Sequence, residues 1–207
     1  MRIALLFYGR IQFLDETYKN MMKVFEGYDV DVFYSADNEA DAGIEKIKTL
    51  YNPISINNTA IVHSIDYSMY PIPSNYYVKM ANMIRHFINL KRVYELMETH
   101  MTSTSTIYDL VVCTRLDFLL FDTSLPIIKP PENTIYIPSG SDHLGINDQF
   151  AMGDIETMKK YMLLIDNCTY LFDNRLAFPH PETVALANIT FHNISVVRFN
   201  IQYKLLH

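Results

Sequence analysis

The chain has 207 residues, a length that fits one ordinary domain with a single substantial core. Hydrophobic residues make up 49% of the sequence and the mean hydropathy is +0.02, which excludes an intrinsically disordered chain. The net charge of -6 argues against a general nucleic-acid binder, because such proteins present a basic face. No stretch approaches the roughly 20 consecutive apolar residues of a membrane span.

Strand and helix patterns alternate along the chain. Short apolar runs predict strands at 3–8, 30–34, 54–57, from Tyr108 onward, 134–137, 149–153 and 194–201. Apolar residues at helical spacing predict helices at 15–26, 39–51, from Ser74 or Asn75 to about 100, 154–172 and 182–189. This alternation predicts an α/β fold with helices on both faces of a mainly parallel sheet. The polar excursion around Gly140, between two short strands, predicts that the sheet is mixed.

We expect residues 1–207 to form a single domain, which could be the N-terminal module of a longer protein. The apolar segment at 3–8 is too short for a signal peptide and is better interpreted as the first buried strand. Cys113 and Cys168 have no Cys or His nearby at metal-ligand spacing, so we expect two buried free thiols in a reducing compartment. The sequence therefore favours a cytoplasmic location.

The first predicted strand ends in Tyr8-Gly9-Arg10. A glycine lets the backbone approach a ligand, and an arginine can bind an anion such as phosphate. The glycine-rich motifs of dinucleotide-binding folds and of P-loops are absent from the sequence. A plain turn between strand and loop explains these residues equally well.

The most informative segment is Arg115-Leu116-Asp117, which follows the buried strand beginning at Tyr108. Ligands bind at the carboxyl ends of strands in open α/β sheets, and Mg²⁺ or Mn²⁺ bridging a diphosphate takes one or two carboxylates from the protein. Asp117 is therefore the candidate metal ligand, and Arg115 points the same way on an extended segment. The alternative is an Arg–Asp ion pair that closes the strand end.

Arg85, on the long predicted helix, lies close enough to the apolar stripe to reach a site.

A second cluster of polar residues lies between 142 and 149. Carboxylate and amide side chains together suit the hydroxyl groups of sugars, although a solvated turn has the same composition. The side chains are those of Asp142, His143, Asn147, Asp148 and Gln149. The lone polar residues His180, Glu182 and His192 are each better explained as a helix cap, a surface residue or a satisfied core histidine.

Taken together, these segments resemble GT-A-type nucleotide-sugar glycosyltransferases, and more narrowly the small glycosyltransferase domains of chlorella-type large DNA viruses. The resemblance covers nearly the whole chain and rests on the segments 3–10, 108–117, 147–153 and 180–183. Most such enzymes carry an Asp-x-Asp triplet that holds Mn²⁺ and the diphosphate of the donor. Here Arg115 stands at the first acidic position.

The resemblance implies Mn²⁺, or Mg²⁺, on Asp117 and a nucleotide-binding segment formed by Phe7, Tyr8, Gly9 and Arg10, with Arg85 and Arg115 as further phosphate or ribose ligands. It favours UDP as the carrier. The expected reaction moves a hexose or deoxyhexose, of glucose or rhamnose type, to a glycan or glycoprotein acceptor, in viral capsid glycan synthesis. Asp148 and Asp142 are the candidate catalytic residues.

The stereochemistry stays open at this point. A general base at Asp148 would give inversion. A front-face route assisted by the diphosphate would give retention, and the sequence-based interpretation favours retention.

Two other functions compete with the transferase. One is a metal-independent glycoside hydrolase that uses Asp117 and Asp148 as its carboxylate pair. The other is a sugar- or nucleotide-binding module without catalysis.

Overall fold

The computed structural model describes residues 1–73, 79–121 and 125–206. Its strands are β1 (Arg2–Tyr8), β2 (Asp29–Ser35), β3 (Ser55–Asn57), β4 (Leu110–Arg115), β5 (Phe118–Leu120), β6 (Thr134–Pro138), β7 (Phe150–Gly153), β8 (Ser195–Phe199) and β9 (Tyr203–Leu205). Its helices are α1 (Leu14–Val24), α2 (Asp41–Tyr51), α3 (Met80–Thr104), α4 (Ile155–Met162), the 3₁₀ helix η2 (Leu164–Asn167), α5 (Cys168–Asp173) and α6 (Pro181–Phe191).

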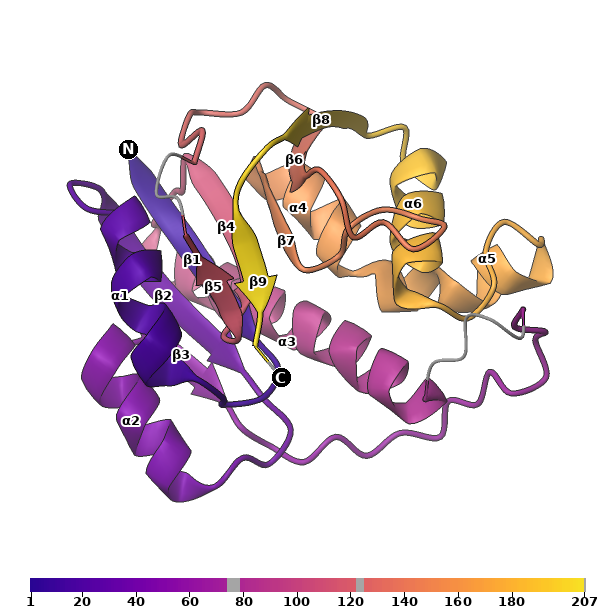
Figure 1. Cartoon of the computed structure of the whole chain (residues 1–207), viewed down its shortest axis with the longest axis horizontal. Coiled ribbons are helices and arrows are strands. Elements are labelled where there is room, and N and C mark those ends of the chain that lie inside the picture. Colours follow the sequence, from indigo (N-terminus) through magenta and orange to yellow (C-terminus); the bar gives the residue numbers. More distant parts are fainter. Residues whose placement is uncertain (74–78, 122–124, 207) are drawn as a thin grey trace.

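Within these residues, seven strands form one sheet in the order β3-β2-β1-β4-β7-β6-β8 (Figure 1). The pairs β1–β2, β1–β4, β2–β3 and β6–β8 are parallel, and β7 runs antiparallel to both β4 and β6. The predicted α/β class with a mixed, mostly parallel sheet is therefore confirmed. The chain leaves β1 toward β2 and β3 on one side and later returns to place β4 on the other side, so the strand order reverses between β1 and β4.

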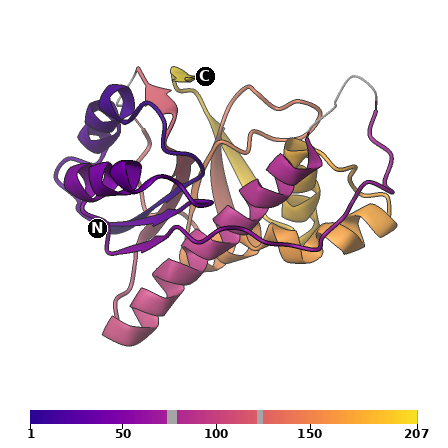
Figure 2. The same cartoon turned by 90° about the horizontal axis from the view of Figure 1, so that it is seen from below.

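From Ile3 to Tyr8 the strand β1 is apolar, because neighbouring side chains pack into two different hydrophobic clusters. Ala4, Leu6 and Tyr8 join a cluster with residues of α3, α4 and α6. Ile3, Leu5 and Phe7 join a second cluster with residues of α1 and α2. Successive side chains of a strand point to opposite faces, which accounts for this division. Figure 2 shows the long helix α3 running across the molecule, at a distance from α1 and α2.

Three segments differ from the sequence-based prediction. The helix predicted over 154–172 is divided into α4, η2 and α5, which lets Leu164, Ile165 and Cys168 all pack into the same cluster. The apolar residues after Asp117 form a separate strand, β5, which pairs with the unpredicted strand β9 in a two-stranded antiparallel sheet. The predicted helix start at Ser74 or Asn75 lies outside the described residues, and α3 is described from Met80.

Both cysteines are buried and free, as the sequence predicts. Among the described residues, no helix combines the length and the apolar character that crossing a membrane requires.

Asp31, in β2, is hydrogen-bonded to Arg2 of β1 and to Tyr108, which precedes β4, at the end of the sheet opposite the carboxyl ends of β1 and β4. Its Oδ2 atom accepts hydrogen bonds from Arg2 Nη2 at 2.8 Å, from Arg2 Nε at 3.1 Å and from the Tyr108 hydroxyl at 2.8 Å. The residue is 9% exposed. Removing a buried charged acceptor leaves its donors unsatisfied, which costs about 1–3 kcal/mol.

We expect Asp31→Asn to lower the free energy of unfolding by about 1–3 kcal/mol in a denaturant titration, since the Tyr108 and Arg2 donors lose a charged acceptor. The matched control is Asp29→Asn. The Asp29 side chain is 69% exposed and lies 3.6 Å from Arg2 Nε, so its change should stay within about 0.5 kcal/mol. Equal effects of the two substitutions would contradict the assignment.

Candidate functional site

A pocket of about 680 Å³ opens at the carboxyl ends of β1, β2 and β4. Open α/β sheets bind ligands where the strand order reverses, and here that point lies between β1 and β4. Because β7 is antiparallel to β4, its first residues lie at this same edge. The pocket is completed by α3 and by the start of α6. Its charged lining residues are Arg10, Asp37, Glu39, Arg85, Arg115, Asp117, Asp148 and Glu182.

The end of β1 contributes the predicted segment Tyr8-Gly9-Arg10 to the pocket. Gly9 has φ 93°, a left-handed conformation that glycine adopts at low cost, and its N–H donates to the Ser35 carbonyl oxygen at 3.0 Å. Arg10 is exposed and, in the described part of the chain, forms no ion pair. Phe7, which was also predicted here, packs instead against the Tyr51 ring at 4.7 Å and does not line the pocket.

Arg115 and Asp117 form an ion pair at the end of β4. Arg115 Nε donates to Asp117 Oδ1 at 2.8 Å, and Nη2 donates to the other carboxylate oxygen. Burial alone would lower the pKa of Arg115, but the hydrogen bonds and charge of Asp117 outweigh it and raise the pKa. The ion pair that the sequence left as an alternative to metal binding is thus present, and both residues line the pocket.

Arg85 lies on α3 at the rim of the pocket, where its Nε atom is 3.0 Å from Asp37 Oδ2. Its side chain is half-exposed. The sequence-based expectation that Arg85 reaches the site agrees with this position, and Asp37, at the end of β2, is a pocket residue that the sequence did not suggest.

Asp148 is a buried carboxyl group of the pocket with a raised pKa. It precedes β7, is 8% exposed, and its carbonyl oxygen accepts a hydrogen bond from the Tyr8 hydroxyl at 2.9 Å. Burial raises the pKa of its carboxyl group to about 6, against the opposing charge of Arg115. The nearest imidazole atom, His86 Nε2, lies 3.7 Å from Asp148 Oδ2. Burial lowers the pKa of His86 to about 3, so we treat this contact as one with a neutral ring and not as an ion pair.

Glu182 is a pocket residue that sequence reasoning missed. It lies in the first turn of α6, directly after Pro181, and is 8% exposed, so it is not a surface residue. Burial, reinforced by the charge of Asp148, raises the pKa of its carboxyl group to about 8. Its Oε2 atom lies 2.8 Å from His180 Nδ1. An acidic residue in the first turn commonly stabilises a helix through its dipole. The sequence therefore carries no signal that distinguishes Glu182 as a pocket residue from an acidic residue with this common role.

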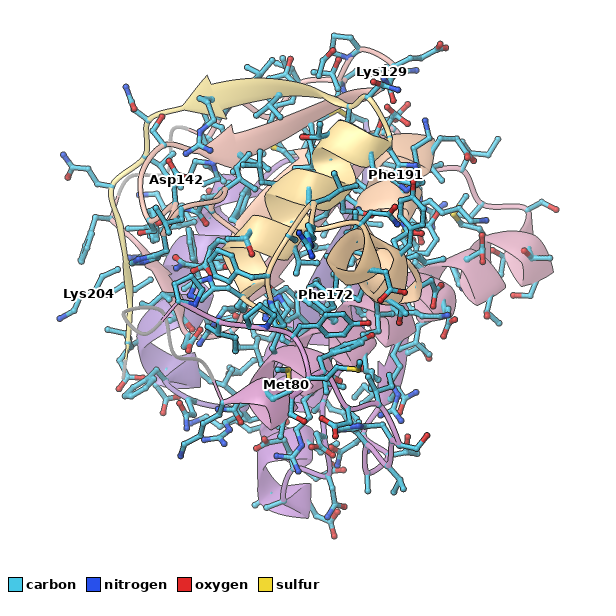
Figure 3. All side chains as sticks on the ribbon, turned by 90° about the vertical axis from the view of Figure 1, so that its right-hand side faces the viewer. Met80, Lys129, Asp142, Phe172, Phe191 and Lys204 are labelled. Atoms are coloured by element: carbon cyan, nitrogen blue, oxygen red, sulfur yellow. The ribbon has the colours of Figure 1, made fainter. Side chains whose placement is uncertain are left out.

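Asp142, predicted as a candidate catalytic residue and sugar ligand, and Asn147, predicted as a sugar ligand, do not line the pocket. Asp142 pairs with Arg198 at 2.6 Å and accepts the Asn147 N–H at 3.0 Å. The Asn147 side chain donates to the Gly140 carbonyl oxygen and to the Tyr203 hydroxyl, and it accepts the Gln149 N–H. These residues therefore shape the loop that holds Asp148. Figure 3 shows Asp142 on this loop and Phe191 at the far end of α6.

The loop is fixed against the start of α6 by a close backbone contact. The Ile146 N–H donates to the Glu182 carbonyl oxygen at 3.0 Å. A Cβ atom on Gly145 would lie 2.0 Å from that same oxygen. Only glycine fits here, and the contact brings Asp148 and Glu182, which are 34 positions apart in the sequence, to one pocket.

The donor set fits a divalent ion only in a limited way. Both oxygens of Asp117 already accept hydrogen bonds from Arg115. Across residues 1–73, 79–121 and 125–206, no three His, Cys, Asp or Glu side chains gather as a metal site. A carboxylate oxygen in a hydrogen bond keeps a second lone pair. One oxygen of Asp117 therefore remains able to bind an ion whose other ligands do not come from these residues.

We expect Gly145→Ala to destabilise the protein by about 1–3 kcal/mol, because the loop must move away from Glu182 to make room for the methyl group. Gly43→Ala is the control. The three atoms nearest to its methyl group all belong to the flexible Ile11 side chain, the closest at 3.0 Å, and alanine is favoured within a helix. Denaturant unfolding of both variants measures the difference, and a Gly145→Ala protein as stable as Gly43→Ala would disprove the close contact.

The chain matches no protein-family model and no curated protein. The resemblance to GT-A-type glycosyltransferases accordingly stays a prediction from the sequence, and the functional argument depends on the geometry of the pocket.

Proposed function

We propose that the protein is a glycosyltransferase that moves a hexose or deoxyhexose from a UDP-sugar to a hydroxyl group of a glycan or glycoprotein, as expected of a GT-A-like fold with helices on both faces of the sheet. The single observation that carries the proposal is the pocket at the reversal point of the strand order. It combines arginine side chains for a diphosphate with a buried carboxyl group whose pKa suits proton transfer.

The order of groups along the sheet edge supports this proposal. Moving from β2 to β1, β4 and β7, the pocket presents Asp37, then Arg10, then the Arg115–Asp117 pair, then Asp148. Three strand spacings cover about 14 Å. A nucleotide sugar has the same linear order, with a nucleoside, a diphosphate and a sugar. We place the diphosphate at the arginines and the sugar near Asp148.

The charge balance of the pocket explains why a metal would accompany the diphosphate. Arg85 is paired with Asp37 and Arg115 with Asp117, which leaves Arg10 as the unpaired cation among the described lining residues. A diphosphate needs more positive charge than one arginine supplies. Mn²⁺ or Mg²⁺ held by the diphosphate and by Asp117 would neutralise the departing UDP as a Lewis acid.

Asp148 has the properties of a general base for the acceptor. In the proposed reaction its carboxylate takes the proton of the acceptor hydroxyl, the acceptor oxygen bonds to the anomeric carbon, and the bond from that carbon to the diphosphate breaks as UDP leaves. The pKa of Asp148, raised to about 6, lies close to neutral pH, and a general base works best when its pKa is near the pH of the reaction. Direct attack of this kind inverts the anomeric centre, so the buried position of Asp148 favours inversion over the retaining route.

A second candidate, a glycoside hydrolase, is favoured by one specific observation. Asp148 and Glu182 are two carboxyl groups in one pocket with different pKa values, which is the arrangement of a base and an acid. The pair expected from the sequence, Asp117 and Asp148, is less suitable because Arg115 holds Asp117. Hydrolysis of a glycoside in the presence of a chelator and without nucleotide would identify this alternative.

The first functional prediction concerns UDP. In calorimetry we expect wild-type protein to bind UDP with Mn²⁺ and to lose about tenfold or more in affinity in a chelator. Asp117→Ala should lower the affinity with Mn²⁺ by a similar factor, because it removes the proposed metal ligand. Asp15→Ala is the control, because the exposed Asp15 side chain lies at the surface and forms an ion pair with the exposed Lys46. Unaltered, metal-independent UDP binding by Asp117→Ala would remove the role given to this residue.

The second functional prediction concerns Asp148→Asn. We expect kcat to fall by about 10²–10⁴ with UDP affinity unchanged within about twofold, since the base is lost and the diphosphate site is intact. In the wild type kcat should rise with pH through about 6, as Asp148 ionises. An equal loss of kcat and UDP affinity would contradict the assignment.

The same group affects stability in a calculable direction. The pKa of Asp148 is raised in the folded protein, so its contribution is present below the ordinary Asp value and is lost as pH rises through about 6. The stability of the wild type relative to Asp148→Asn should therefore fall between about pH 4 and pH 6, as measured by thermal unfolding.

A further inference from the structure

Gln149 has a buried amide oxygen that lines the pocket without a partner. The residue is 9% exposed, and within the described residues its Oε1 atom accepts no hydrogen bond. Its main chain is fixed on both sides: the N–H donates to Asn147 Oδ1 at 2.9 Å, and the carbonyl oxygen accepts from the Thr114 hydroxyl at 3.3 Å. A buried polar atom without a partner requires an explanation, and a ligand is one.

His86 presents a second such atom. Its Nε2 atom is buried and, within the same part of the chain, has no hydrogen-bond partner. The ring is held edge-on against the Tyr8 ring at 5.0 Å and against the Phe87 ring at 5.4 Å. Since the ring is neutral, Nε2 can accept or donate one hydrogen bond but cannot neutralise a phosphate.

Glu182 faces the same part of the pocket from α6. Its raised pKa keeps the carboxyl group protonated near neutral pH, so it can both donate and accept a hydrogen bond without carrying a charge. Its backbone is fixed by the Ile146 N–H, as described above. Three elements therefore bring uncharged or acceptor groups to the region beside Asp148.

We infer that Gln149, His86 and Glu182, together with Asp148, form the subsite that binds the hydroxyl groups of the transferred sugar. Hydroxyl groups are both donors and acceptors, and they match this set of groups in a way that phosphate oxygens, which only accept, do not. The location agrees, because Gln149 directly precedes β7, which lies beyond β4 on the side away from β1 and Arg10. His86 Nε2 lies 3.7 Å from Asp148 Oδ2, and Glu182 lines the same pocket. This inference rests on the proposed function.

The test compares UDP with UDP-glucose and UDP-rhamnose by calorimetry, in Mn²⁺ at pH 7, for the wild type and for Gln149→Met. Methionine keeps the approximate volume of glutamine and removes the acceptor. We expect UDP affinity within twofold of the wild type and about fivefold weaker binding of the preferred UDP-sugar, the effect of one neutral hydrogen bond. Gln12→Met is the matched control, because exposed Gln12 lines the pocket on the loop after β1. It should change UDP and UDP-sugar affinity equally.

A second pair of variants tests Glu182 independently. Glu182→Gln keeps an uncharged donor and acceptor and should retain the preference for UDP-sugar over UDP, whereas Glu182→Leu should lose it by about fivefold. Thermal unfolding verifies that each variant is folded.

The inference is overturned if Gln149→Met and Glu182→Leu leave the ratio of UDP-sugar to UDP affinity unchanged, which would mean that water alone satisfies these atoms. An equal loss for UDP and UDP-sugar would overturn it as well, because the groups would then act on the nucleotide. If the wild type binds neither UDP nor a UDP-sugar, the proposed function itself fails, and this outcome differs from both of the others.

Discussion

The pairing of Arg115 with Asp117 determines how charge is distributed in the pocket. Each of these groups, left alone at the end of a buried strand, would be costly, and together they satisfy one another through two hydrogen bonds. Asp117 neutralises the charge of Arg115, the cation close to Asp148. Burial therefore dominates the pKa of Asp148, which is raised although an arginine is close by. An unpaired Arg115 would hold that carboxyl group ionised and weakly basic.

The second constraint is the contact of the loop before β7 with the first turn of α6. Glycine at 145 allows the two backbones to approach, and the Ile146 hydrogen bond fixes their register. The internal hydrogen bonds of the loop, through Asp142 and Asn147, then hold Asp148 and Gln149 at the pocket. Polar residues that the sequence suggested as sugar ligands thus act by positioning their neighbours.

These contacts explain how much of the molecule could be predicted from sequence. The continuous apolar runs of β1 and β4 are typical of buried strands, so the sheet was predictable. The residues that follow these strands were also predictable as its carboxyl edge, namely Gly9, Arg10, Arg115 and Asp117. Strand β9 was not, because it has three residues and owes its existence to pairing with β5, more than 80 positions earlier. Phe7 was wrongly included in the nucleotide-binding segment. It directly precedes Tyr8, which lines the pocket, and adjacent side chains of a strand point to opposite faces of the sheet. The sequence could not show that Glu182 lines the pocket and that Asp142 does not, because local composition does not reveal which polar groups form hydrogen bonds or ion pairs with each other.

The electrostatic design of the pocket follows from this arrangement. Its cations are concentrated at the ends of β1 and β4 and on α3, and most of them are already paired with carboxylates of the same region. The part beside β7 and α6 contains a neutral imidazole, an amide oxygen and carboxyl groups with raised pKa values. A ligand that is charged along its whole length would be poorly satisfied at one end, and a neutral polyol would gain nothing from the arginines. A molecule with a charged middle and a hydroxyl-rich end would satisfy both parts, and this is the reason for proposing a nucleotide sugar as the ligand.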